Sequence, residues 1–104
     1  MNTQTTVIIP VRNGEQFLGQ AMASVLSQLF RDDRLVVVND GSTDGTLSVV
    51  ASVRDSRITL LNSNRRGVSA ARNVGLAAAA GDFVAFLDHD DLWPPSRHLS
   101  LIHI

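Results

Sequence analysis

The sequence predicts an α/β fold in which a mainly parallel sheet lies between layers of helices. Apolar runs suited to strands alternate with helical patterns in the order β-α-β-α-β-α-β, and short polar loops connect them. This alternation implies right-handed crossovers that place the helices on the faces of a twisted sheet. The apolar residues are mostly Val, Leu, Ile and Ala, and only 5% of residues are aromatic, which is typical of buried parallel strands under small-residue helices.

Four apolar runs are predicted to form the strands. Each run is rich in β-branched or other apolar residues, is too short for an amphipathic helix and is followed by polar or turn-forming residues. Pro10 is expected to end the first strand. The predicted strands are Val7–Ile9, Leu35–Val38, Ile58–Leu61 and Phe83–Leu87.

Three segments between these runs carry apolar residues at spacings of three and four, as helices that cover a sheet do. Ser42, Thr43 and Asp44 are good N-caps for the second helix, and Gly81 closes the Ala-rich third. The predicted helices are Phe17–Leu29, a segment through Leu47 and Val53, and Ser69–Ala80, with Ser96–Ile104 expected to begin another helix after a turn at Trp93.

Length and composition bound the kind of protein. The chain has 104 residues, and we interpret residues 1–104 as a single, incomplete domain. A net charge of −1 argues against a nucleic-acid partner, and the lack of cysteine excludes disulfides and thiolate metal sites. The apolar run that ends at Pro10 is too short for a signal peptide or a membrane span, so we expect a soluble, cytoplasmic protein.

Unusual polar residues gather where each predicted strand ends. In an open α/β sheet the carboxyl ends of the strands form the ligand crevice, so these residues should meet at one rim. Polar loops are common on any surface, but carboxylates at two strand ends and arginines at two others make a complementary site. The four clusters are Arg12–Asn13, Asn39–Asp40, Asn62–Arg66 and Asp88–Asp91.

The run Asp88–Asp91 carries the sharpest chemical signal. Its three carboxylates repel one another unless a cation neutralises them, and Asp oxygens suit Mg²⁺ or Mn²⁺. We therefore predict that this acidic run binds a divalent cation. The alternative is an acidic turn that caps a following helix, with His89 as a spacer or charge partner.

Two further clusters suit a nucleotide. Gly41 allows close approach of the backbone to a ligand, and Asp40 can accept hydrogen bonds from a base or ribose, although good turn chemistry alone explains this segment too. Arg65, Arg66 and Arg72 flank the start of the third helix and could bind phosphate. The alternatives are a solvated loop for the first two and a structural ion pair for Arg72.

These motifs, in this order, resemble the family 2 glycosyltransferases of the GT-A fold, which is Rossmann-like with three α/β/α layers. The resemblance covers residues 7 to about 95. The matching stretches are Val7–Gly14, Ser24–Gln28, Val38–Thr46, Gly67–Leu76 and Gly81–Pro94.

The resemblance implies an enzyme that transfers a sugar from a nucleoside-diphosphate sugar, typically UDP-linked and usually with inversion, to an unknown acceptor in cell wall or polysaccharide biosynthesis. It implies a divalent cation, Mg²⁺ or Mn²⁺, that bridges the diphosphate. The implied site residues are Pro10 and Arg12 lining the base pocket, Asp40 on the base, Arg72 near the nucleotide, and Asp88 and Asp90 as the D-x-D motif that binds ribose and metal.

The sequence also departs from the family pattern. Arg12 stands where an aromatic residue is common, Asn39 replaces a common Asp, and His89 replaces a small residue within D-x-D. Family domains are about twice this long. We therefore expect residues 1–104 to be the N-terminal nucleotide-sugar-binding half, inactive alone, without the acceptor half and the general base, in a parent enzyme at the inner face of the membrane.

One alternative belongs to a different functional class. The chain could be a non-catalytic α/β interaction or assembly module derived from this fold, with a homodimer formed through an exposed sheet edge or through the face meant for the missing half. A nucleotidyltransferase is disfavoured because residues 10–14 do not form the Gly-rich basic loop that such enzymes carry.

Overall fold

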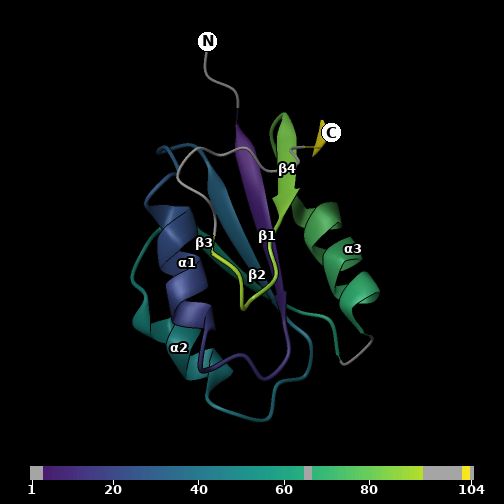
Figure 1. The fold of residues 1–104 in the computed structure, drawn as a ribbon. Coiled ribbons are helices and arrows are strands. Elements are labelled where there is room, and N and C mark those ends of the chain that lie inside the picture. Colours follow the sequence, from purple (N-terminus) through teal and green to yellow (C-terminus); the bar gives the residue numbers. More distant parts are fainter. Residues whose placement is uncertain (1–3, 65–66, 93–101, 104) are drawn as a thin grey trace.

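The computed structural model describes residues 4–64, 67–92 and 102–103 and forms one sheet with helices on both faces (Figure 1). The strand order is β3-β2-β1-β4-β5, with β5 antiparallel to β4 and every other pair parallel. The strands are β1 Thr5–Val11, β2 Arg34–Asn39, β3 Ile58–Asn62, β4 Phe83–Phe86 and β5 Ile102–His103. The helices are α1 Leu18–Leu26, α2 Thr46–Ser52 and α3 Val68–Ala78. The predicted α/β class and mainly parallel sheet are confirmed.

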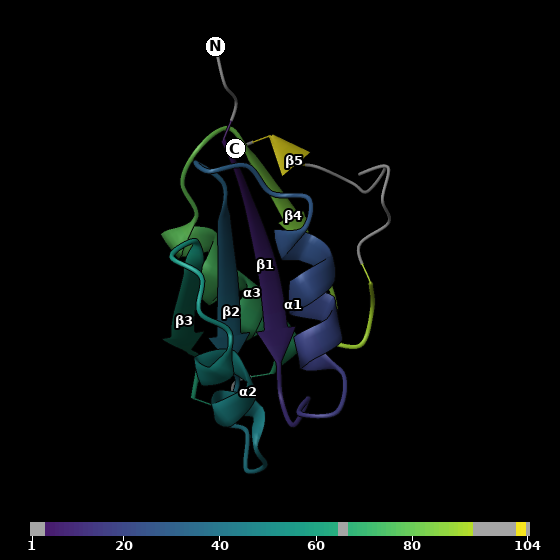
Figure 2. The same ribbon diagram turned by 90° about the vertical axis from the view of Figure 1, so that its left-hand side faces the viewer.

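The sheet separates two apolar layers, which confirms the three-layer α/β/α arrangement (Figures 1 and 2). Alternate residues of β1 point to opposite faces, as the pleat requires. Val7 and Ile9 belong to the cluster under α1 and α2, and Ile8 belongs to the cluster under α3. All three side chains are fully buried, so β1 is the central strand of the domain.

Pro10 does not end the first strand, contrary to the prediction. It lies within β1 and pairs with Val38 of β2. The carbonyl of Ile8 accepts a hydrogen bond from Leu87 N–H, on the β4 side, and the recorded β1–β4 pairs end at Ile8. Two residues further along β1, the backbone of Pro10 is directed to the same β4 side as that of Ile8. Because the pairing with β4 has already ended there, the missing N–H of Pro10 removes no hydrogen bond from the sheet.

The helix boundaries also differ from the prediction, for local reasons. Helix α2 begins at Thr46 behind Gly45, and Ser42 and Thr43 hydrogen-bond to Asn13 instead of capping the helix. The chain leaves α3 at Ala79, which is extended, before Gly81 turns it with φ +96°.

The helix expected over 96–104 is wrong where it can be compared. Ile102–His103 forms β5, which pairs antiparallel with Phe83 and Val84 of β4. The rest of that segment, the predicted turn at Trp93, and Arg65 and Arg66 lie outside the described residues. Within the described residues, none of the helices is long and apolar enough to cross a membrane.

A pair at the start of β3 gives the fold a measurable dependence on acid. The carboxylate of Asp55 accepts hydrogen bonds from the Arg57 guanidinium at 2.7 and 2.9 Å and from Arg57 N–H at 2.9 Å, and Arg57 also donates to the carbonyl of Leu29. The side-chain bonds from Arg57, followed by its backbone N–H, lower the pKa of Asp55 from 3.8 to about 2.

Because the folded pKa of Asp55 lies below the unfolded one, the unfolded chain takes up the proton first as the pH falls. The stabilising contribution is complete above about pH 4 and largely lost near pH 2. We expect Asp55→Asn to lower the free energy of unfolding by about 1 kcal/mol at pH 7, since the pair is partly exposed. Urea unfolding from pH 7 to pH 2 should show this difference shrinking. The exposed Asp32→Asn is the control, and an equal Asp55→Asn effect at both ends of the range would contradict the assignment.

Strand β3 is the outer edge of the sheet, with β2 as its partner. Leu60 at its centre is 40% exposed, and the strand contains neither proline nor a charged residue. Such an edge can accept a further strand. The homodimer expected through a sheet edge stays a prediction, and β3 is where we would place it.

Candidate functional site

A cavity of about 440 Å³ opens at the carboxyl ends of β1, β2 and β4, beside the start of α3. This is the edge of a parallel sheet where ligands bind in open α/β folds. Four segments of the sequence supply its walls, and the predicted residues Pro10, Arg12, Asp40, Asp88 and Asp90 all lie among them. The lining residues are Pro10, Val11, Arg12, Asp40, Gly67, Val68, Ala71, Asp88, His89 and Asp90.

Asp40 forms the buried floor of this cavity. It directly follows β2, its N–H donates to the carbonyl of Val11 at 2.8 Å, and the residue is only 5% exposed. Its carboxylate accepts hydrogen bonds from the Ser63 hydroxyl on Oδ1 at 2.7 Å and from Gly67 N–H on Oδ2 at 2.9 Å. A carboxylate offers about four acceptor positions, and these two bonds hold one oxygen each at the floor of the cavity.

The loops that follow β1 and β2 are fastened to each other, and we call these bonds the loop–loop clasp. Backbone N–H groups of residues 13, 14 and 15 donate to the side chains of Ser42, Thr46 and Asp44 at 2.9, 3.0 and 3.3 Å. In return, Asn13, with φ +56°, accepts from Thr43 N–H at 2.7 Å.

A short hydrogen bond from Thr46 Oγ1 to Asp44 completes the loop–loop clasp. This side-chain bond lowers the pKa of Asp44, so the carboxylate is kept as an acceptor. The wall that carries Arg12 is therefore anchored to the wall that carries Asp40.

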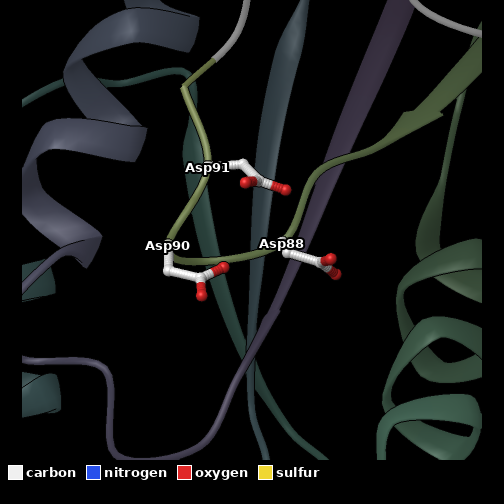
Figure 3. A group of neighbouring side chains, drawn as sticks. All are labelled: Asp88, Asp90 and Asp91. Carbon is white, nitrogen blue, oxygen red and sulfur yellow. The ribbon is translucent and has the colours of Figure 1, made fainter.

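Three aspartates follow β4 in a single turn, which Asp91 N–H closes on the carbonyl of Asp88 at 3.0 Å (Figure 3). Asp88, Asp90 and Asp91 each offer a carboxylate oxygen, and these oxygens lie within 4.8 Å of one another. All three side chains are exposed, so water and a cation can reach them. Hard oxygen donors at this spacing fit Mg²⁺ or Mn²⁺. Asp91 was part of the predicted acidic run but was not predicted as a ligand.

Arg72 reaches the rim from α3, although it does not line the cavity. Its Nη2 lies 3.4 Å from Asp88 Oδ1, and its guanidinium sits 5.9 Å from the centre of the Phe86 ring. Figure 3 shows the Asp88 side chain on the side of the turn that faces α3. This contact is the ion pair considered as an alternative for Arg72, and it also places a positive charge beside the aspartates.

Arg72 retains hydrogen-bonding capacity at this position. Its Nε is buried and has no hydrogen-bond partner among the described residues. The ion-paired side chains of Arg72 and Asp88 are 42% and 55% exposed. A weak, hydrated ion pair of this kind can rearrange when an anionic ligand arrives.

Two contacts at the site could not be predicted from the sequence. His89 packs on Gly14, where an added Cβ would lie 2.6 Å from His89 Cδ2 and 2.6 Å from Val11 Cγ2. Asn39 donates from its amide to Asn62 Oδ1 at 3.1 Å and accepts from Ser42 N–H. His89 therefore ties the aspartate turn to the loop after β1, and Asn39 ties β2 to β3. The clustering of polar residues at strand ends predicts that such contacts form, but it does not predict which residues pair.

Comparison with known proteins agrees with this architecture. The sequence matches the family described as glycosyl transferase family 2 over residues 6–103. It is 42% identical over 89 residues to the Escherichia coli UDP-Glc:alpha-D-GlcNAc-diphosphoundecaprenol beta-1,3-glucosyltransferase WfgD, covering 85% of this chain and 35% of that enzyme.

Two solved structures share the fold. Staphylococcus aureus TarS 1-349 in complex with UDP-GlcNAc superposes with a TM-score of 0.79 at 34% identity, covering 86% of this chain and 27% of that one. The mannosyltransferase from Pyrobaculum calidifontis in complex with GDP-Man and Mn2+ superposes with a TM-score of 0.81 at 33% identity, covering 93% of this chain and 30% of that one. The chain thus spans about a third or less of the length of these relatives. It has the GT-A fold and belongs to glycosyl transferase family 2.

Proposed function

We propose that this chain is the donor-binding part of a glycosyltransferase that moves a sugar from a nucleoside-diphosphate sugar, with UDP as the nucleotide, to an acceptor. The observation that carries the proposal is the strand-end cavity, which Asp40, Asp88 and Asp90 line, with the Arg72 guanidinium 3.4 Å from Asp88 at its rim. Departure of a diphosphate from a sugar creates negative charge, and fixed positive groups stabilise it.

The base is proposed to lie against the wall formed by the loop–loop clasp. Asp40 accepts hydrogen bonds and cannot donate any while ionised, so it suits a base edge that carries N–H, as uracil does at N3. Guanine also presents N–H groups, and a GDP-Man complex exists among the neighbours. The UDP-glucose donor named for the E. coli relative and the UDP-GlcNAc complex of TarS favour UDP here. Arg12 offers a planar guanidinium that can stack on the base.

A divalent cation is proposed at Asp88 and Asp90, with Asp91 as a third oxygen donor. The three carboxylate oxygens within 4.8 Å fit the ligand set of Mg²⁺ or Mn²⁺. When bound, such a cation supplies Lewis-acid stabilisation of the departing diphosphate. Arg72, now 3.4 Å from Asp88, is placed to take a phosphate oxygen at the same rim.

The activity of the whole protein is a wider proposal. An inverting transfer needs a general base for the acceptor hydroxyl, and we assign that base and the acceptor pocket to parts of the longer relatives that this chain does not span. The chain alone is therefore proposed to bind the donor without turning it over. The lipid-linked diphosphate named in the E. coli relative supports a role in polysaccharide or cell wall synthesis. We propose that this synthesis takes place on the cytoplasmic side of a membrane.

Titration calorimetry with UDP tests the proposal. We expect binding that becomes about tenfold tighter with Mn²⁺, because Asp88 and Asp90 would hold the cation and its positive charge would attract the diphosphate. Asp90→Ala should remove the gain from Mn²⁺ and leave metal-free binding nearly unchanged. Asp32→Ala, an exposed acid in the turn before β2, is the matched control and should keep the full gain.

Two other results would contradict the proposal. Binding that ignores both Mn²⁺ and Asp90→Ala would contradict the metal site. A chain that binds no UDP and forms a tight dimer in light scattering would favour the non-catalytic assembly module instead.

A further inference from the structure

We propose that Ser63 is a positioning residue, which orients the Asp40 carboxylate so that the pocket prefers a base carrying N–H over one carrying a bare ring nitrogen. This inference rests on the proposed function, since it assigns a partner to the residue that would contact the base. Ser63 follows β3, and Asp40 follows β2, so they lie at adjacent strand ends. In the sequence, Ser63 is marked only as a member of the polar cluster Asn62–Arg66.

The contact between the two residues is short and buried. Ser63 is 3% exposed and Asp40 is 5% exposed. The Ser63 hydroxyl donates to Asp40 Oδ1 at 2.7 Å, and its backbone N–H donates to the carbonyl of Asn39 at 3.0 Å. The serine is thus held by the end of β2 through its backbone, and its hydroxyl is aimed at the carboxylate from a fixed point.

The rotation of the Asp40 carboxylate is restrained by donors on both of its oxygens. The terminal torsion of an aspartate is broad and has no strong preference of its own. Ser63 holds Oδ1, while Gly67 N–H at 2.9 Å holds Oδ2 from the start of α3. Loss of the Ser63 donor weakens the hold on Oδ1, so the carboxylate faces the cavity in a less fixed direction.

The base that this arrangement selects follows from hydrogen-bond chemistry. Uracil presents an N–H at ring position 3, which an oriented carboxylate accepts. Cytosine has an unprotonated nitrogen at that position. Its lone pair would face a lone pair of the carboxylate, and no hydrogen bond could form between them. A site with buried polar groups rejects a ligand that leaves them unpaired. Ser63 should therefore act on the ratio of UDP to CDP affinity as well as on UDP affinity.

If Ser63 had a purely structural role, its loss would lower stability without changing nucleotide binding. Thr6, another buried hydroxyl residue, provides a matched control. Thr6 is 1% exposed, and its hydroxyl donates to the carbonyl of Ala80 at 2.8 Å, at the opposite end of the sheet. Ser63→Ala and Thr6→Val each delete one buried hydroxyl with little change in size. Both should lower the thermal midpoint, but only Ser63→Ala should change nucleotide binding.

Calorimetry with UDP and with CDP on the 104-residue chain tests the inference. We expect Ser63→Ala to weaken UDP binding about tenfold and to reduce the UDP-to-CDP preference, as the loss of a hydrogen bond to a charged group would. Thr6→Val should change neither value. In an Asp40→Asn background, Ser63→Ala should add nothing, because its effect passes through Asp40.

The outcomes separate this inference from the proposed function. If the unsubstituted chain binds no UDP, or if Asp40→Asn binds it equally well, the nucleotide assignment itself is wrong. If Asp40→Asn loses UDP but Ser63→Ala behaves like Thr6→Val, or weakens UDP additively with Asp40→Asn, only the positioning role is wrong. Should Ser63→Ala fail to fold, Ser63→Cys, which keeps a weak donor of similar size, is expected to give a smaller loss in the same direction.

Discussion

Asp40→Asn is expected to weaken UDP binding by about 10- to 100-fold, the range expected when a charged hydrogen-bond partner is lost at a buried site. The carboxylate already serves Ser63 and Gly67, both of which donate. An amide keeps only one acceptor oxygen. If that oxygen stays on Gly67 N–H, the NH₂ points towards the Ser63 hydroxyl, which can turn to accept it, and fewer lone pairs are left for the base N–H. Calorimetry with UDP measures the loss.

The direction of this effect is informative, because UDP is an anion. Removal of an acidic residue should strengthen anion binding if only overall charge mattered, so a weaker complex points to a specific hydrogen bond. Asp82→Asn is the control, since Asp82 is an exposed acid at the amino end of the sheet that accepts from Gln4 N–H. Unchanged UDP affinity in a folded Asp40→Asn variant would show that Asp40 does not contact the base.

Gly75→Ala is expected to destabilise the fold by about 1–3 kcal/mol, although alanine is the better helix former. A Cβ on Gly75 would lie 2.5 Å from Ile8 Cγ2 and 3.2 Å from Val38 Cγ2. Both neighbours are fully buried on β1 and β2, so neither can move away cheaply. Urea unfolding should show a lower midpoint with an unchanged slope.

Gly19 in α1 provides the same substitution in a different environment. A Cβ there would lie 3.6 Å from Val49 Cγ1, which is an ordinary contact. Gly19→Ala should therefore stabilise the chain by about 0.5 kcal/mol through lower unfolded-state entropy. If Gly75→Ala were also stabilising, α3 would not be seated on the sheet as closely as described.

The fold could be predicted because its signals are local. Each apolar run and each spacing of three or four residues can be identified from a short window, and the order of elements then fixes a parallel sheet. The ends of the strands and helices are harder to predict, because they depend on which other elements lie beside them in the fold. Proline usually ends a strand because it has no N–H to donate. Pro10 is nevertheless tolerated within β1, because the pairs between β1 and β4 stop at Ile8. Ile102–His103 was expected to be helical, but it pairs with β4.

The convergence of the site could be predicted in part, from strand polarity. Since the carboxyl ends of parallel strands share an edge, Asp40 and the aspartates after Leu87 had to approach one another. The partners of these residues could not be predicted. Ser63 contacts Asp40 because Asn39 and Asn62 are in register, and register is set by the whole sheet. The roles of the cavity residues in binding remain predictions.

The loop–loop clasp divides freedom unequally between the two walls of the strand-end cavity. Three of its bonds run from main-chain N–H groups of residues 13–15 to the side chains of Ser42, Asp44 and Thr46, whereas no bond of the clasp uses the side chain of residue 12. Arg12 is exposed and heads the tolerant wall. A library that seeks a new nucleotide preference should therefore randomise position 12 and keep positions 42, 44 and 46 fixed, because the first wall stays anchored whatever side chain position 12 presents.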